Sequence, residues 1–403
     1  MTEKHRILLL EAIHPVARDA LVAEGFDVEL LDASLSEDEL CDRVRSVHAI
    51  GIRSKTQITE RVLRSADDLL VVGAFCIGTN QVDLATATHR GVPVFNAPFS
   101  NTRSVAELVI AEVVMLSRQL GDRVREMHGG RWRKAAKGAR EVRGKTLGVV
   151  GYGHIGRQVG VLAEAMGMRV VFHDILTQLP MGNNEPVGTL DELLERSDFV
   201  TLHVPATAQT HMMIGREQLA RMRPGAALLN LSRGTVVDIP ALADAIRSEH
   251  LSGASVDVYP EEPHKNVSDE FHTELQDVPN VILTPHIGGS TLEAQENIGR
   301  EVALSLTKYL KAGATTGSVN FPHCELPWVA DTHRVVNIHQ NVPGVLRDLN
   351  RIVSDADANV QAQILATNPE IGYLIMDLDE EVSAQVCERM THVETTIRAR
   401  ALS

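Results

Sequence analysis

The chain of 403 residues has few aromatic side chains, few cysteines and no long uninterrupted apolar run. Aromatic residues make up 3% of it, so aliphatic side chains must supply most of any core. The four cysteines lie far apart without a CxxC pair, which argues against a zinc site and a disulfide framework and fits a reducing cytoplasm. Glu11 interrupts the N-terminal apolar run, and no run approaches the length of a membrane span, so neither a signal peptide nor a spanning helix is predicted.

Excess positive charge is also missing. The formal net charge of -14 creates a field that repels DNA, RNA and anionic membrane surfaces, and no run of Lys or Arg interrupts it. We therefore expect no nucleic-acid or membrane partner. The 44% of apolar and 23% of charged residues are typical of a globular protein, and the length exceeds what one core usually organises, so two or three domains are expected.

Two series of alternating strand and helix patterns fill most of the chain. The first hundred residues alternate short apolar runs, such as RILLL and LLVVGAF, with helical patterns, which is typical of βα units on a parallel sheet. Apolar residues spaced by three and four then predict one long helix over residues 104–130. From Lys145 a second series predicts six strands, which is the number that a complete dinucleotide-binding fold requires. A helical pattern over 290–313 is expected to return the chain to the first domain, which would then be discontinuous.

The C-terminal part has a different pattern. Residues 314–333 are rich in small residues and Pro and show no period, so they are interpreted as a linker. Beyond them the order β-α-β-β-α-β predicts a ferredoxin-like fold. A domain of this size would gain stability by pairing its sheet with a second copy.

A glycine-rich turn follows the first strand of the second series. In VVGYGHIG, Gly151 permits a tight turn, Gly153 lets a pyrophosphate approach the backbone, and Gly156 lets helix and strand pack closely. Asp174 ends the next predicted strand, where a carboxylate would accept hydrogen bonds from an adenosine ribose. An acid at this place, with no Arg beside it, favours NAD over NADP. The alternative is a purely structural glycine turn.

Three polar residues follow successive later strands of the same predicted sheet. Arg233 offers a rigid charged fork for a carboxylate, and Glu262 beside an imidazole would raise the histidine pKa into the range of a general acid. His286 would be that imidazole. Each residue alone is explained equally well as loop charge or a structural histidine, but three of them at the ligand-binding edge of one sheet predict a site.

In this order the residues resemble the D-isomer-specific 2-hydroxyacid dehydrogenases, and within them the bacterial type with a C-terminal ACT domain. The motifs GIRSKTQIT, FCIGTNQVDL, GYGHIGRQ, LNLSRGTVVDIPAL, DVYPEEP, LTPHIGGSTLEAQENIG and IHQNVPGVL match along nearly the whole chain. The resemblance implies that Arg233 binds the substrate carboxylate, Glu262 pairs with the imidazole and His286 is the acid/base. It further implies NAD contacts at Gly151, Gly153, His154, Ile155, Gly156, Asp174, Leu231, Ser232, Arg233, Asp257, His286, Ile287, Gly288 and Gly289.

The resemblance also implies a fold and an activity. The expected fold is α/β, with a discontinuous flavodoxin-like substrate domain (1–101 and 291–320), a Rossmann NAD-binding domain (102–290) and a ferredoxin-like ACT domain (332–403). The expected reaction is NAD-dependent oxidation of 3-phospho-D-glycerate on the route to serine, without a metal. A dehydrogenase for another D-2-hydroxyacid, such as 2-hydroxyglutarate, and an NAD-sensing regulator of the corepressor type are the alternatives. The candidates for binding the substrate phosphate are Arg53, Lys55, Asn101 and Arg103.

The last domain is expected to bind an effector. ACT domains that resemble this one bind an amino acid between paired copies, and in this family the ligand is L-serine. His339 and Asn341, at a strand-to-helix turn, and Asn359, before the next strand, are its candidate ligands, with ordinary loop polarity as the alternative. Two kinds of pairing are expected, one through the ACT sheets and one through the helical region of the Rossmann domain. Because two independent two-fold contacts generate a tetramer, a homotetramer is predicted.

Overall fold

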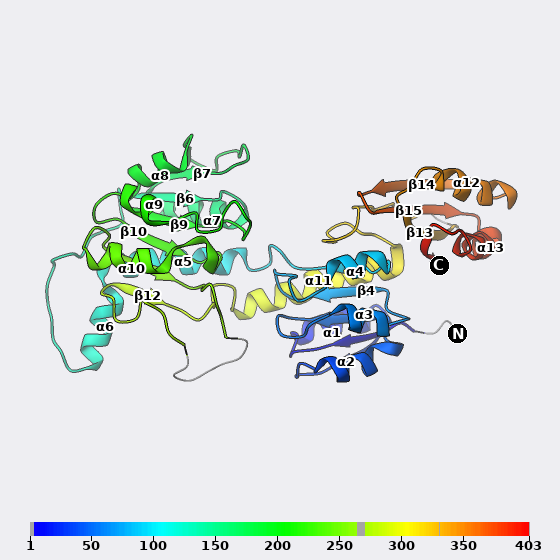
Figure 1. The fold of residues 1–403 in the computed structure, drawn as a ribbon, viewed down its shortest axis with the longest axis horizontal. Coiled ribbons are helices and arrows are strands. Elements are labelled where there is room, and N and C mark those ends of the chain that lie inside the picture. The colour runs from blue at the N-terminus through cyan, green and yellow to red at the C-terminus, as the bar shows by residue number, and fades with distance from the viewer. Residues whose placement is uncertain (1–3, 264–270, 330, 403) are drawn as a thin grey trace. The chain divides into compact units, whose positions relative to one another are not determined.

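The computed structural model describes residues 4–263, 271–329 and 331–402, and the chain divides into two compact units (Figure 1). One unit combines the chain up to Ser100 with the chain from Gln295 onward, and the other comprises Asn101–Ala294. Within the described ranges, no helix is long and apolar enough to cross a membrane.

The first unit contains a five-stranded parallel sheet with strand order β2-β1-β3-β4-β5. This is the flavodoxin-like order predicted for the substrate domain. Its central strands are apolar along their whole length because helices cover both faces. The elements are β1 (Arg6–Leu9), α1 (Pro15–Ala23), β2 (Asp27–Leu30), α2 (Glu37–Arg43), β3 (Ala49–Ile52), α3 (Glu60–Ser65), β4 (Val71–Ala74), α4 (Leu84–His89) and β5 (Val94–Phe95).

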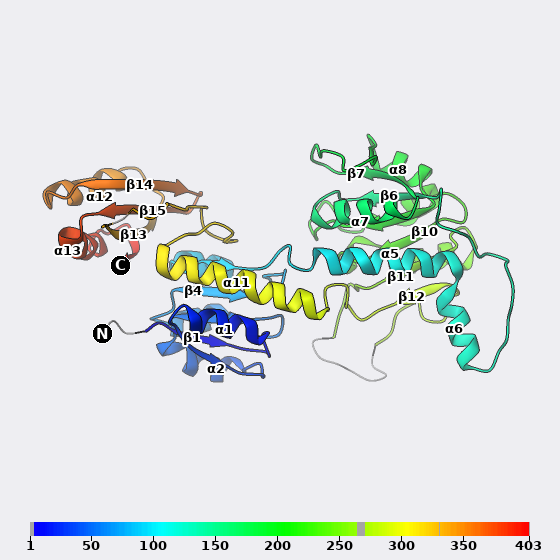
Figure 2. The ribbon, with the colours of Figure 1, turned by 180° about the vertical axis from the view of Figure 1, so that it is seen from behind.

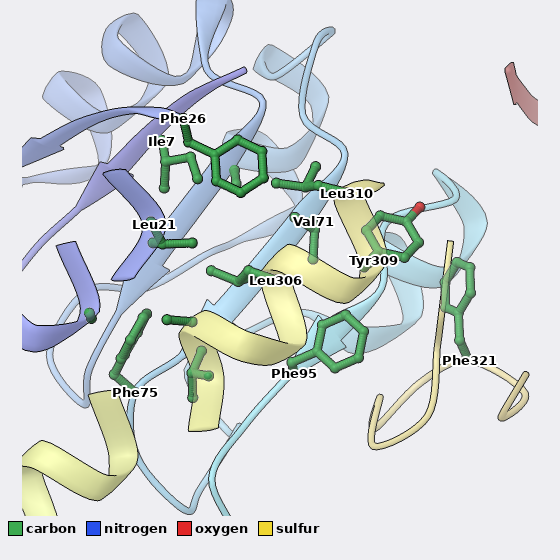
Figure 3. Packing of buried hydrophobic residues seen from close by; sticks show 14 of the residues in the cluster. Ile7, Leu21, Phe26, Val71, Phe75, Phe95, Leu306, Tyr309, Leu310 and Phe321 are labelled. Carbon is green, nitrogen blue, oxygen red and sulfur yellow. The ribbon is translucent and has the colours of Figure 1, made fainter. Parts of the chain in front are cut away.

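Helix α11 (Leu292–Ala312) supplies much of the core of this unit (Figures 2 and 3). Its residues Leu306, Tyr309 and Leu310 are buried in one cluster with Val71 and Phe95 of the sheet. The return of the chain to the first sheet, expected from the pattern over 290–313, is therefore present.

The second unit contains a seven-stranded parallel sheet with order β12-β11-β10-β9-β6-β7-β8, as in a Rossmann fold. Six of its strands were predicted; β8 was not, since it has only two residues and both are exposed. Its strands are β6 (Thr146–Val150), β7 (Arg169–His173), β8 (Glu185–Pro186), β9 (Phe199–Leu202), β10 (Ala227–Asn230), β11 (Gly253–Val256) and β12 (Val281–Leu283). Its helices are α5 (Thr102–Arg118), α6 (Leu120–His128), α7 (His154–Ala165), α8 (Leu190–Arg196), α9 (Arg216–Arg221) and α10 (Ile239–Arg247).

The prediction of a single helix over 104–130 is wrong. Gln119 has a left-handed backbone (φ 52°, ψ 38°) and separates α5 from α6. Its N–H closes α5 by donating to the carbonyl oxygens of Leu116 and Met115. The apolar spacing continues through the break, so the pattern alone could not reveal it.

The C-terminal part of the first unit is a four-stranded antiparallel sheet with order β14-β15-β13-β16, which confirms the ferredoxin-like prediction. Helices cover one face, where Leu349, Met376 and Met390 are buried. The other face contributes Tyr373 to the same core as Phe321 of the linker. The elements are β13 (His333–Gln340), α12 (Val345–Asp355), β14 (Val360–Thr367), β15 (Ile371–Leu378), α13 (Glu380–Thr391) and β16 (Thr396–Leu402).

A buried arginine fixes the linker to this sheet. The guanidinium of Arg334 pairs with both carboxylate oxygens of Asp377, at 2.7 and 2.8 Å, and both residues are fully buried. Its remaining N–H groups donate to the carbonyl oxygens of Ala312, Leu326 and Pro327. Arg334 thus ties the sheet to the end of α11 through Ala312 and to the linker through Leu326 and Pro327.

Candidate active site

The glycine loop lies between β6 and α7 and leaves no space for side chains at two of its glycines. Gly151 has φ 88°, and a Cβ there would lie 2.5 Å from the carbonyl oxygen of His203. A Cβ on Gly156 would lie 2.3 Å from the carbonyl oxygen of Gly151. Gly153, by contrast, faces open space at the N-terminus of α7, where backbone N–H groups can receive a pyrophosphate.

Asp174 follows β7 and is oriented by backbone groups. Its Oδ2 accepts a hydrogen bond from the N–H of Tyr152 in the glycine loop at 2.8 Å, and its Oδ1 accepts one from Leu176 at 2.9 Å. The carboxylate is therefore fixed beside the loop. Open backbone at Gly153 and an oriented carboxylate beside it are the features that a dinucleotide requires, so these residues fit NAD.

Arg233 follows β10, and the turn that carries it is tightly determined. Asn230 accepts hydrogen bonds from the N–H and hydroxyl of Ser232 and donates to the carbonyl oxygen of Arg233 at 3.0 Å. At Gly234 a Cβ would lie 1.9 Å from the carbonyl carbon of Tyr259, so only glycine permits this approach. The close contact brings the turn after β10 against the segment that leads to Glu262.

Asp257, at the end of β11, positions the loop that carries His286. Its side chain is buried, with 1% exposed. Its Oδ1 accepts hydrogen bonds from the hydroxyl of Thr284 (2.6 Å) and the N–H of Ile287 (2.8 Å). Its Oδ2 accepts a hydrogen bond from the N–H of Gly288 (2.8 Å). His286 itself has φ 54°, a conformation that costs a non-glycine residue energy and is often found at functional sites. A buried carboxylate thus holds a strained backbone in place.

His286 and Glu262 form a hydrogen-bonded pair. The Nδ1 atom of His286 lies 2.7 Å from Oε2 of Glu262, and Oε1 of Glu262 accepts the N–H of Tyr259 at 3.0 Å. The hydrogen bond to Glu262 raises the His286 pKa above its ordinary value, against partial burial and the charge of Arg233. Burial alone would raise the Glu262 pKa, but the bonds to His286 and Tyr259 outweigh it and lower that pKa.

The three predicted catalytic residues therefore follow β10, β11 and β12, which are neighbours in the sheet. Arg233 is close enough to act electrostatically on both Glu262 and His286. Because Glu262 occupies Nδ1, the Nε2 atom of His286 is the ring nitrogen left for proton exchange with a substrate. The arrangement can clamp a carboxylate and transfer a proton beside it.

The phosphate candidates belong to different units. Arg53 and Lys55 follow β3 in the first unit, and the carboxylate of Glu11 accepts hydrogen bonds from the N–H groups of Arg53 (3.1 Å), Lys55 (3.0 Å) and Thr56 (2.8 Å). In the sequence Glu11 stands out only as an interruption of an apolar run. Its place directly after the apolar run RILLL, which ends at the buried Leu10, is the signal that could identify it.

In the second unit, Asn101 is 8% exposed, and its side chain lies where a Cβ on Gly289 would be, 2.3 Å from Nδ2. Asn101 therefore packs against the glycine turn after His286. Arg103 is exposed on α5 and pairs with Glu107 at 2.6 Å.

The effector candidates do not gather within one ACT domain. His339 is 3% exposed, and its Nδ1 lies 2.9 Å from Oδ1 of Asn337; burial lowers its pKa. Asn341, after the same strand, donates to the carbonyl oxygen of Asn368 at 2.7 Å. Asn359 is exposed and precedes β14, and the strand register places it at the opposite end of the sheet from His339.

Comparison with known proteins decides the family. The family model described as "D-isomer specific 2-hydroxyacid dehydrogenase, NAD binding domain" matches residues 110–288, and the model "AHAS small subunit-like ACT domain" matches 336–398. A D-3-phosphoglycerate dehydrogenase of Dictyostelium discoideum is 54% identical over 400 residues, covering 99% of this chain and 98% of the relative. This chain belongs to the D-3-phosphoglycerate dehydrogenase family. The D-3-phosphoglycerate dehydrogenase of Escherichia coli (strain K12) is 50% identical over 403 residues, covering 99% and 98%.

Solved structures agree with this membership. The D-lactate dehydrogenase of Aquifex aeolicus, complexed with NAD and lactic acid, is 27% identical with a TM-score of 0.64, covering 75% of this chain and 95% of that one. The TT0316 protein of Thermus thermophilus is 33% identical with a TM-score of 0.68, covering 76% and 96%. The expected family and fold are confirmed, and the chain is an NAD-dependent oxidoreductase.

Proposed function

We propose that the chain oxidises 3-phospho-D-glycerate to 3-phosphohydroxypyruvate with NAD, the first step of the phosphorylated route to L-serine. The similarity to D-3-phosphoglycerate dehydrogenases over 99% of the chain supports the substrate. The observation that carries the chemistry is the pair of His286 and Glu262, 2.7 Å apart, beside Arg233.

Each residue then has a defined role. The Arg233 guanidinium binds the substrate carboxylate and orients the C2 hydroxyl. Nε2 of neutral His286 takes the hydroxyl proton, and Glu262 stabilises the imidazolium that forms. NAD, when bound at the glycine loop and Asp174, supplies the acceptor for the C2 hydride. In the reverse direction the imidazolium returns its proton to the carbonyl oxygen.

For the substrate phosphate we favour Arg53 and Lys55, because Glu11 fixes their backbone and leaves cationic side chains at the carboxyl end of β3. The test is a steady-state comparison of 3-phosphoglycerate with D-2-hydroxyglutarate. Lys55→Ala should raise the KM for 3-phosphoglycerate about tenfold or more, whereas Arg18→Ala, an exposed control on α1, should leave it unchanged. Equal kcat/KM for both acids in the wild type would favour the alternative substrate.

A regulatory NAD sensor is the alternative from another class. It predicts slow turnover with every hydroxyacid, and it gives the ACT domain no role. Turnover of 3-phosphoglycerate on the order of 1 s⁻¹ or faster would exclude it.

We also propose that L-serine binds between two ACT domains and slows the reaction. His339 and Asn341 at one end of the sheet and Asn359 at the other fit a ligand shared between two copies better than a ligand within one. Strand β14 supports such pairing, since it is an edge strand with Leu365 partly exposed. Serine should inhibit the wild type, and Asn341→Ala and Asn359→Ala should each weaken inhibition without changing kcat. Absence of inhibition in the wild type would overturn this proposal.

We propose that a second pairing surface, in addition to the ACT domain, makes the protein a homotetramer. We place this tetramer in the cytoplasm. The candidate for the second surface is helix α6, because none of its residues is buried and Leu120, Val124 and Met127 are about half exposed. Sedimentation of the wild type should give a tetramer, and Val124→Asp should give a dimer. A tetramer that survives this substitution would contradict the assignment of α6 as an interface.

A further inference from the structure

A buried carboxyl group lies behind the active site without a hydrogen-bond partner. Glu112 on α5 is 1% exposed, and in the part of the chain that the structure describes neither of its oxygens makes a hydrogen bond. Helix α5 packs against β10, β11 and β12, the strands whose ends carry Arg233, Glu262 and His286. The proposed reaction assigns no role to this side chain.

The nearest polar groups come from β11. Ser255 is fully buried, and its hydroxyl also lacks a hydrogen bond of good geometry, although it is close enough to act on Glu112. Asp257 comes two residues later, directly after β11, where the alternation of the strand directs it to the same side as Ser255. Its negative charge acts on Glu112.

Few other charges face this position. Strands β10 and β12 carry no ionisable side chain. Tyr259, after β11, is close enough to interact with Glu112, and its hydroxyl donates to the carbonyl oxygens of Val256 and Thr284. The ionisable residues of α7 are His154, which begins the helix at the glycine loop, and Arg157 and Glu164, which are engaged by Gln178 and Asn183.

The neighbouring carboxyl groups of Asp257 and Glu112 are thus stabilised in opposite protonation states. Asp257 accepts three hydrogen bonds from the His286 loop on its two oxygens, an arrangement that favours a carboxylate, which is an acceptor only. Glu112 has no partner, and a second buried carboxylate beside the first would be strongly unfavourable. Burial raises the pKa of Glu112 to about 7; the Ser255 hydroxyl opposes the rise and the charge of Asp257 adds to it.

We propose that Glu112 is a positioning residue that acts through Asp257. While Glu112 carries its proton, Asp257 keeps its hydrogen bonds to Ile287 and Gly288 and the His286 loop stays in place. When Glu112 loses the proton, repulsion between the two carboxylates weakens those bonds and loosens the loop. The consequence for catalysis rests on the proposed role of His286, but the structural claim does not.

The decisive experiment compares the wild type with Glu112→Gln, which has nearly the same shape and cannot ionise. Hydrogen exchange of a peptide covering 281–291 should be the same in both proteins at pH 6. At pH 8.5 it should be several-fold faster in the wild type. Comparison at one pH cancels the intrinsic effect of pH on exchange. The matched control is Glu217→Gln on α9, an exposed glutamate, which should follow the wild type at both pH values.

Two further readouts distinguish positioning from a purely structural role. The infrared spectrum at pH 6 should contain a protonated carboxyl band that Glu112→Gln lacks and Glu217→Gln keeps. The ratio of kcat/KM of Glu112→Gln to that of the wild type should rise as pH increases through about 7. Two results would overturn the proposal. One is equal hydrogen exchange of the 281–291 peptide in the wild type and Glu112→Gln at pH 8.5. The other is a Glu112→Gln spectrum that keeps every protonated carboxyl band of the wild type. If no 3-phosphoglycerate is oxidised, the proposed function fails, while exchange and infrared data still decide on Glu112.

Discussion

The Nδ1 atom of His286 lies 2.7 Å from the Oε2 atom of Glu262, and this pair joins the ends of two adjacent strand-and-loop units of the Rossmann sheet. The carboxylate orients the ring through Nδ1 and favours the imidazolium. Both side chains remain partly exposed, as a group that exchanges a proton with a substrate must be.

Glu262→Gln should lower kcat for oxidation by about 10- to 100-fold and shift its pH dependence. Oxidation requires neutral His286, so kcat/KM rises as the pH increases through the histidine pKa. Glu262 raises that pKa above 6.5, so the variant should reach half of its maximal kcat/KM at a lower pH than the wild type. Superimposable pH profiles of kcat/KM would show that Glu262 does not tune His286.

Two glycine substitutions should separate folding from cofactor binding. Gly234→Ala places a Cβ 1.9 Å from the Tyr259 backbone, so it should lower the free energy of unfolding by about 2 kcal/mol or more and displace Arg233. Gly153→Ala meets no atom within 4 Å, so it should fold normally but raise the KM for NAD, because the new methyl group occupies the path of the pyrophosphate. Urea unfolding and NAD kinetics check both. The reverse pattern would contradict the roles given to the two glycines.

Asp377→Ala should destabilise the ACT domain and the linker together. It leaves the fully buried Arg334 without its carboxylate, and loss of one partner of a buried ion pair costs about 3–5 kcal/mol. Thermal unfolding measures the loss. Asp348→Ala, which removes an exposed ion pair with Arg347 on α12, is the control and should change stability by less than about 1 kcal/mol. A loss in the first variant no larger than in the second would mean that the buried pair is not what anchors the linker.

The features predicted correctly from the sequence are those that depend on local order. The alternation of apolar strands with helices predicts both parallel sheets. The order of Arg233, Glu262 and His286 predicts that they follow neighbouring strands, because parallel strands present their carboxyl ends at one edge, and the structure pairs His286 with Glu262. Their catalytic roles stay a prediction. The apolar pattern does not predict the helix break at Gln119 or the two-residue strand β8, because neither feature alters that pattern.

Partners that are distant in sequence were not predictable. The place of Glu11 after an apolar run marks it as an acid at a strand end, but the local sequence does not indicate that it will accept a hydrogen bond from the backbone of Arg53. Nor does the sequence around Glu112 indicate that it will be close enough to Asp257 for their charges to interact. Asp257 was expected to contact the cofactor, but its hydrogen bonds to Ile287 and Gly288 became evident only from the folded loop.

The measurement that tests the central claim most directly is NADH formation from 3-phosphoglycerate by the wild type and by His286→Asn. Asparagine preserves a polar side chain and tolerates the positive φ of 54° at this position, so the variant should fold and bind NAD. Without a proton acceptor, kcat should fall by about 100-fold or more. Unchanged turnover in His286→Asn would contradict the assignment of His286 as the acid/base and with it the proposed mechanism.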